Sequence, residues 1–203
     1  MSCSPTQKKS VDTPTLLKAT RERISLRGLA RVFGVGRKTI KPWFKEALQA
    51  LPRFADSVDP ARANDVLELD ELWSFVGSKK QQVWLWVALC RRTRQVVAYT
   101  LGDRSTQTCQ QLYNKLPDTY KHCKSYSDFW DAYTKVFPKT SHQAFGKEAG
   151  ETNHVERWNN TLRQRMARFV RKTLSFSKSL ASHHMLTKWF IFHYTLECDS
   201  SCT

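Results

Sequence analysis

The stretch VLELDELWSFVG, residues 66–77, decides the fold class that we predict for this chain of 203 residues. This stretch and the sequence after it contain short runs of aliphatic and aromatic side chains separated by turn residues such as Gly77, a pattern typical of strands. The run 83–90 is apolar throughout, as expected for a strand buried on both faces. The strands that the pattern predicts are 66–70, 72–76, 83–90 and 95–101.

Downstream of these strands the pattern changes mainly to helix. The expected elements are a helix at 107–116 capped by Ser105 and ended by Pro117, a strand at 121–127 and a helix at 129–136. Apolar residues then recur every three or four positions from Val155 to Phe169, which predicts a helix with one apolar stripe. Strands combined with helices in this order predict an α/β domain with a mixed sheet.

Upstream of the sheet, the segment LRGLARVFGVGRKTIKPWFK at 26–45 predicts a helix-turn-helix. Gly34 falls where the turn needs a left-handed backbone, and the second helix carries the basic side chains expected to enter the DNA major groove. These side chains are Arg37, Lys38, Lys41 and Lys45. Pro42 predicts that the second helix is kinked or short. The alternative is an ordinary helical hairpin with a basic exposed face.

The chain therefore predicts a small all-α domain followed by an α/β domain. The segment between these domains contains two prolines and shows no regular spacing of apolar residues, which indicates a linker. The predicted organisation is a flexible N-terminal segment at 1–21, a helix-turn-helix domain at 22–50, a linker at 51–64, an α/β domain at 65–194 and a flexible tail at 195–203.

The net charge of +15, from 33 Lys and Arg against 18 Asp and Glu, predicts a polyanionic partner, either nucleic acid or an anionic membrane. No apolar run approaches the roughly 18 residues of a spanning helix. The N-terminal ten residues have no apolar signal-peptide region. We therefore expect a cytoplasmic protein that binds nucleic acid and has no membrane partner.

Three carboxylates are the candidate catalytic and metal-binding residues. Asp70 is the last residue of the predicted strand 66–70, Asp128 stands at the end of the later predicted strand, and Glu156 lies on the last predicted helix. Each acid alone is typical of a solvated charge, but convergent carboxylates are what two Mg²⁺ ions need for phosphoryl transfer. Glu68 alternates onto the same strand face as Asp70 and is the main rival. The other nearby acids are Glu71 and Asp131.

The segment 157–178 contains seven Lys and Arg and no acid. A charge run is usually a solvated face, but this one continues directly from Glu156, so it is a candidate for binding the phosphodiester backbone. The residues we assign to this role are Asn160, Arg163, Arg168, Arg171 and Lys172.

Three motifs closely resemble the transposases of the insertion-sequence-one family, which belong to small bacterial mobile elements. They are LELDELWSFVG at 67–77, SDFWDAY at 127–133 and NHVERWNNTLRQRMARFVRKTLSFSKS at 153–179. The helix-turn-helix upstream is similar to that of the same family, so the resemblance covers about 26–194. It implies a ribonuclease-H-like catalytic domain with an Asp-Asp-Glu triad and Mg²⁺ or Mn²⁺. By motif, the triad is Asp70, Asp128 and Glu156, which demotes Glu68, Glu71, Asp131 and Glu151.

The resemblance also implies the partners. They are double-stranded DNA, as element terminal repeats and as target, and a second copy of the chain when two ends are brought together in the bacterial nucleoid. Family members usually carry a cysteine-rich zinc-finger module ahead of the helix-turn-helix, where this sequence has only Cys3. This departure indicates either a truncated protein or end recognition by the helix-turn-helix alone. Two other functions stay open: a repressor of the element with an idle catalytic domain, and a nuclease that cuts without joining.

Overall fold

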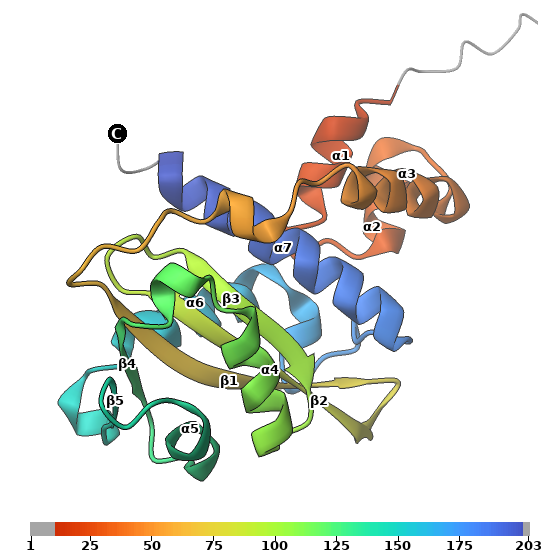
Figure 1. Ribbon diagram of the computed structural model, residues 1–203. Helices are drawn as coiled ribbons and strands as arrows, with labels where there is room; N and C mark the ends of the chain where they lie inside the picture. The colour runs from red at the N-terminus through yellow and green to blue at the C-terminus, as the bar shows by residue number, and fades with distance from the viewer. Residues whose placement is uncertain (1–10, 201–203) are drawn as a thin grey trace, which may run out of the picture. The chain divides into compact units, whose positions relative to one another are not determined.

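The structure, a computed structural model, describes residues 11–200 and divides into two compact units after Ala50. The first unit is helical, and the second contains a five-stranded mixed sheet with helices (Figure 1). The predicted mixed α/β class is confirmed. Among the described residues, no helix has both the length and the apolar character needed to cross a membrane.

The first unit consists of α1 (Thr13–Ala19), α2 (Leu26–Phe33) and α3 (Arg37–Gln49). Its core is formed by one apolar residue from each helix: Leu16, Leu29 and Ile40. The Ser25 hydroxyl caps α2 by accepting a hydrogen bond from the Gly28 N–H. Gly34 ends α2 with φ +66°, in the left-handed region predicted for this turn.

Two details of this unit differ from the prediction. Of the segment 1–21, expected to be flexible, residues 1–10 lie outside the described residues, and the rest contains α1, because Leu16 gives this short helix a buried anchor. The second helix, expected to be either kinked or short at Pro42, is not short, since it runs over thirteen residues. Pro42 is exposed and lies early in α3, so the Lys38 carbonyl that loses its helical partner can bind water instead.

The sheet of the second unit has the strand order β3-β2-β1-β4-β5. The strands are β1 (Val66–Val76), β2 (Ser78–Cys90), β3 (Val96–Gly102), β4 (Lys124–Ser127) and β5 (His142–Ala144). The first three are antiparallel neighbours, and β4 and β5 continue the sheet in parallel with β1. The central strand β1 therefore has an antiparallel partner on one side and a parallel partner on the other.

Helices cover both faces of this sheet (Figure 1). They are α4 (Thr106–Lys115), α5 (Asp131–Val136), α6 (Asn153–Arg165) and α7 (Leu180–Ser200). Leu67 and Leu69 pack with Leu112 of α4 and Tyr133 of α5 in one buried core. The N-cap at Ser105 is confirmed, since its hydroxyl accepts from the Thr108 N–H.

Several predicted boundaries in this unit were wrong. The segments 66–70 and 72–76 form one continuous strand, because the intervening Glu71 is neutralised by Arg104 instead of breaking the strand. β2 begins at Ser78, five residues before the apolar run, where exposed polar residues extend the hairpin. The three-residue strand β5 was not predicted, because it is too short to show a periodic pattern.

The segments expected to be linker and tail are also structured. Residues 51–64 contain a short 3-10 helix, and the backbone N–H of Asp59 donates to Gln95 at 3.0 Å, which holds the segment on the second unit. The tail at 195–203 was expected to be flexible, but α7 continues to Ser200. The buried Thr195 contributes to this, since its carbonyl accepts from Gln95 Nε2 and its hydroxyl donates to the Val96 carbonyl.

Candidate active site

Asp70 and Asp128 are brought together by the parallel pairing of β1 with β4. Glu68 of β1 lies opposite Tyr126 of β4, so Asp70 and Asp128, each two residues further on, are next in register. Asp128 follows directly after the end of β4, as predicted. Asp70 does not end its strand as predicted but lies within β1, opposite Val87 of β2.

Glu156 reaches the same site from α6, which packs on β1. One turn further along this helix, Asn159 donates from Nδ2 to the Asp70 carboxylate at 2.6 Å, which fixes the helix directly over the strand. The Glu156 carboxylate accepts a hydrogen bond from the Thr152 hydroxyl at 3.2 Å. The three predicted acids thus lie on the face of the sheet that α6 covers. The side chain of each is partly exposed to solvent.

The electrostatics of Asp70 reflect this convergence. Burial first, and then the charges of Glu71, Asp128 and Glu156, together raise the pKa of Asp70 to about 7, while the hydrogen bond from the Glu71 N–H acts in the opposite direction. Over residues 11–200, none of the three acids forms an ion pair with Lys, Arg or His. The site therefore concentrates negative charge that no ion pair among the described residues neutralises, and Arg163 is the cation whose charge acts on Asp70 from a longer distance.

This shift predicts a pH-dependent stability. Between pH 3.8, the ordinary pKa of Asp, and about 7, the unfolded chain has lost the Asp70 proton while the folded chain keeps it. The stability that this group contributes is thus present below about pH 3.8 and is lost as the pH rises to about 7.

The measurement is the free energy of urea unfolding from about pH 4 to about pH 8 in the presence of a chelator, for the natural chain and for Asp70→Asn. We expect the difference in free energy to move in favour of Asp70→Asn as the pH rises. A difference that is constant over the range would contradict the raised pKa of Asp70.

The acids do not form a closed ligand cage. Among the described residues, no three His, Cys, Asp or Glu side chains are placed to hold one metal ion together. The Asp128 carboxylate accepts from the Trp130 N–H at 3.0 Å, and Glu156 is turned toward Thr152. The three carboxylates are thus near enough for their charges to interact, but their oxygens are not arranged to bind one metal ion together.

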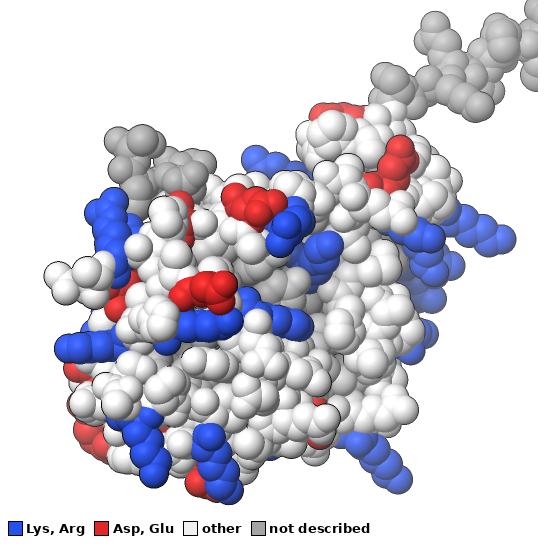
Figure 2. All heavy atoms as spheres, viewed as in Figure 1, with Lys and Arg blue, Asp and Glu red and all other residues white. Residues whose placement is uncertain are grey.

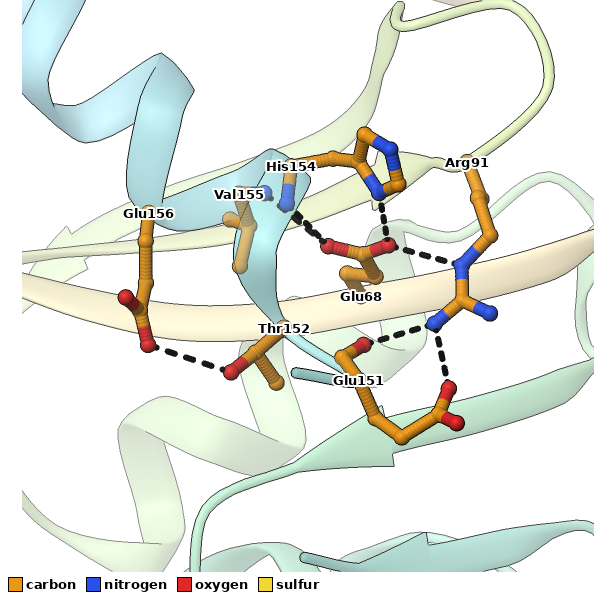
Figure 3. A network of polar contacts seen from close by, with 7 residues as sticks. All are labelled: Glu68, Arg91, Glu151, Thr152, His154, Val155 and Glu156. Atoms are coloured by element: carbon orange, nitrogen blue, oxygen red, sulfur yellow. Dashed lines mark hydrogen bonds and ion pairs between the residues drawn. The ribbon is translucent and has the colours of Figure 1, made fainter. Parts of the chain in front are cut away.

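Glu68, the main rival, has a different role. Its carboxylate is fully buried and accepts from Arg91 Nε at 2.8 Å, from His154 Nδ1 at 2.6 Å and from the backbone N–H groups of His154 and Val155. Figure 3 shows this carboxylate at the N-terminus of α6, while Glu156 points away from it toward Thr152. Glu68 therefore anchors the first turn of α6 to β1 and has no free oxygen to offer a ligand.

The other demoted acids are also engaged. Glu71 points to the opposite face of β1, where Arg104 and the Tyr133 hydroxyl bind its carboxylate. Glu151 pairs with Arg91 at 2.8 Å. Asp131 pairs with Lys135 on the surface of α5. Each of these carboxylates has a cationic partner, unlike Asp70, Asp128 and Glu156.

Asn159 is the residue at this site that sequence reasoning missed. We expected Asn160 to share a face with Glu156, but the structure exposes Asn160 and buries Asn159 against Asp70. The signal was present, because Asn159 lies three positions after Glu156 and so is also on its face. It was overlooked because the buried stripe was assigned to apolar residues alone.

The predicted DNA-contacting side chains fall into two groups. Those of α3 (Arg37, Lys38, Lys41 and Lys45) are all exposed, as are Arg171 and Lys172 after α6. Lys and Arg side chains project from the surface at many points (Figure 2). Arg168 instead turns inward: it donates to the Ser177 hydroxyl at 3.2 Å, and burial lowers its pKa to about 10. Arg163 lies close enough to Asp70 for the two charges to interact.

Comparison with known proteins identifies the family. The family profile described as IS1 transposase matches residues 65–195. The chain belongs to the IS1 transposase family. The match covers the sheet and all three acids of the site. The predicted resemblance to this family is confirmed.

Curated members of the IS1 family are similar over more than half of this chain. The insertion element iso-IS1n protein InsB of Shigella dysenteriae is 43% identical over 126 residues, which are 62% of this chain and 93% of that protein. The insertion element IS1 protein InsB of Shigella flexneri is 37% identical over 116 residues, 57% of this chain and 86% of that protein. The insertion element IS1 4 protein InsB of Escherichia coli strain K12 is 36% identical over 57% of this chain and 67% of that protein.

Proposed function

We propose that this protein is a DNA transposase that cuts and joins DNA strands at insertion-element ends, using Asp70, Asp128 and Glu156. The observation that supports the chemistry is the group of three acids that form no ion pair among the described residues, one of which has its pKa raised to about 7. Membership of the IS1 transposase family supports the substrate class. The order of antiparallel strands followed by parallel ones is consistent with a ribonuclease-H-like catalytic domain.

The side chains of this site fit Mg²⁺ or Mn²⁺ in kind. The available donors are carboxylate oxygens, which these hard cations prefer, and the Asn159 Oδ1 beside them is buried without a hydrogen-bond partner. When bound, divalent cations supply a lowered pKa for the attacking oxygen and stabilisation of the leaving oxygen. Asp70, Asp128 and Glu156 would hold them, and cation binding would relieve the charge repulsion that, in addition to burial, raises the pKa of Asp70.

Basic side chains would place the DNA against these acids. Burial and the charge of Arg171 lower the pKa of Arg163, while Asp70 raises it, which indicates that the guanidinium lies between the acids and the basic segment after α6. This arrangement suits binding of a DNA phosphate next to the reacting bond. In the first unit, the exposed cations of α3 are suited to the major groove.

The test is incubation of the full chain with Mg²⁺ and a labelled duplex that carries the terminal repeats of the element. Both nicked and joined products are scored. A transposase gives both, a nuclease gives only nicked strands, and a repressor binds the duplex without changing it. Family membership favours the transposase over the repressor.

We also predict that DNA binding weakens steeply with salt. A chain of net charge +15 that binds phosphates releases condensed counterions, and each neutralised phosphate adds about 0.9 to the slope of log affinity against log salt. Lys41→Ala should therefore lower the slope by roughly 0.9, measured by fluorescence anisotropy between about 50 and about 200 mM salt.

Lys135→Ala is the matched control, because this lysine pairs with Asp131 on α5, and the slope should not change. Arg37→Ala and Lys38→Ala should reduce the preference for terminal-repeat DNA over a scrambled duplex. A slope near zero for the natural chain would contradict phosphate contacts as the source of affinity.

A further inference from the structure

The side-chain amide of Asn159 has a hydrogen-bond partner for its nitrogen, and among the described residues it has none for its oxygen. It lies on the buried face of α6 and is 5% exposed. Its Nδ2 donates to Asp70 Oδ2 at 2.6 Å, and its Oδ1 accepts no hydrogen bond in the structure. A buried amide oxygen without a donor is unfavourable, since it has lost water and gained nothing.

The surroundings of this oxygen indicate what it lacks. Asn159 lies one turn of α6 after Glu156 and one turn before Arg163, next to the strand that carries Asp70. Asp128 and Glu156, whose charges act on Asp70 from this face of the sheet, are negative and would attract a hydrated cation to this position, and the charge of Arg163 also interacts with Asp70. A water held by such a cation has protons to donate, which is what Asn159 Oδ1 needs.

The contact to Asp70 has a consequence of its own. An ionised carboxylate accepts about four hydrogen bonds, and Asp70 uses one for the Glu71 N–H and one for Asn159. These two donors, from its own strand and from α6, fix the carboxylate plane and leave the remaining lone pairs for a cation. Loss of the Asn159 donor would free the carboxylate to rotate.

We propose that Asn159 is a positioning residue of the acidic site, whose Nδ2 orients Asp70 and whose Oδ1 accepts a hydrogen bond from a hydration water of the bound divalent cation. This inference rests on the proposed function. Removal of a group that hydrogen-bonds to a metal ligand and orients it commonly lowers the metal affinity by about 10- to 100-fold.

The experiment is a titration of the full chain with Mn²⁺ in the absence of DNA, in which the electron paramagnetic resonance signal of free Mn²⁺ reports binding. Asn159→Leu keeps a similar volume and removes both polar atoms, and we expect its affinity for Mn²⁺ to fall about 10- to 100-fold. Gln164→Leu is the matched control, because Gln164 is exposed on the same helix, and its affinity should equal that of the natural chain.

A second readout separates positioning from a general effect on the fold. If Asn159 acts through the cation, strand cleavage by Asn159→Leu should be restored by raising Mn²⁺ by the factor that its affinity has lost. A purely structural defect would not respond to Mn²⁺. Where the circular dichroism of Asn159→Leu shows loss of the fold, Asn159→Ser, which is polar and smaller, takes its place with the same expectation.

The outcomes distinguish this inference from the proposed function. If Asp70→Asn abolishes Mn²⁺ binding while folded Asn159→Leu or Asn159→Ser binds Mn²⁺ as the natural chain does, the role of Asn159 is wrong and the proposed function stands. If the natural chain binds no Mn²⁺, with or without terminal-repeat DNA, the proposed function and the inference both fail.

Discussion

Asp70→Asn is expected to lower the rate of strand cleavage and joining by roughly a thousandfold or more, while the affinity for DNA changes little. Asp70 is the acid on which the charges of Asp128 and Glu156 act, so it lies at the centre of the group. Asparagine has nearly the same shape but carries no charge to hold a divalent cation. A group that acts on the transition state affects the chemical step and not DNA docking.

The measurement is single-turnover cleavage of labelled terminal-repeat duplex, with DNA affinity determined separately by anisotropy. Asp131→Asn is the matched control, because Asp131 is a nearby acid whose charge is used by Lys135 on the surface of α5. It should cleave at close to the natural rate. Cleavage by Asp70→Asn within about tenfold of the natural rate would exclude Asp70 from the reaction.

The proximity of the three acids could be predicted because each has a local signature, and their catalytic role stays a prediction. Asp70 and Asp128 each lie at a segment with the sequence pattern of a strand. Parallel pairing of these two strands is sufficient to bring the two residues together. Glu156 occurs in a long motif typical of the family. What the sequence could not show is the role of Glu68, since its position on the strand is equivalent to that of Asp70. Only the tertiary contacts of Glu68 with Arg91 and α6 separate the two.

Asn159 shows a second limit of sequence reasoning. It lies four residues after Val155 and three before Leu162, both of which are buried, so helical geometry alone would place it on the buried stripe. A polar residue is counted as outward-facing when burial is inferred from residue type. Polar residues that serve a site break this rule, because their partner is another buried polar group.

The last turns of the C-terminal helix were missed for a related reason. Residues 195–200 are mostly polar and show no regular spacing of apolar residues, so their sequence looks the same as that of a disordered tail. Their helical conformation continues from the apolar part of α7, and Thr195 is held by Gln95 and Val96. Contacts between residues about a hundred positions apart cannot be detected from local composition.

Glu68→Ala is expected to destabilise the chain by about 3 kcal/mol, which corresponds to a fall of roughly 10 °C in Tm. The substitution leaves three donors at the start of α6 without their acceptor: the partly buried His154 Nδ1 and backbone N–H, and the buried Val155 N–H. The value lies at the low end for a broken buried ion pair, because Arg91 is partly exposed and keeps Glu151 as a partner. Differential scanning calorimetry of the full chain provides the measurement.

Two variants separate the helix anchor from the charge pair. Glu68→Gln keeps an oxygen for the His154 and Val155 N–H groups and loses the charge facing Arg91, so its Tm should lie between those of the natural chain and Glu68→Ala. Glu151→Ala removes the other partner of Arg91, which is about one-third exposed, and should cost less than about 1 kcal/mol. Since α6 carries Glu156 and Asn159, Glu68→Ala should also lower the rate of cleavage at temperatures well below its Tm, where the chain is still folded. An equal loss of stability in Glu68→Ala and Glu151→Ala would mean that Arg91 pairing, and not the α6 anchor, is what Glu68 contributes.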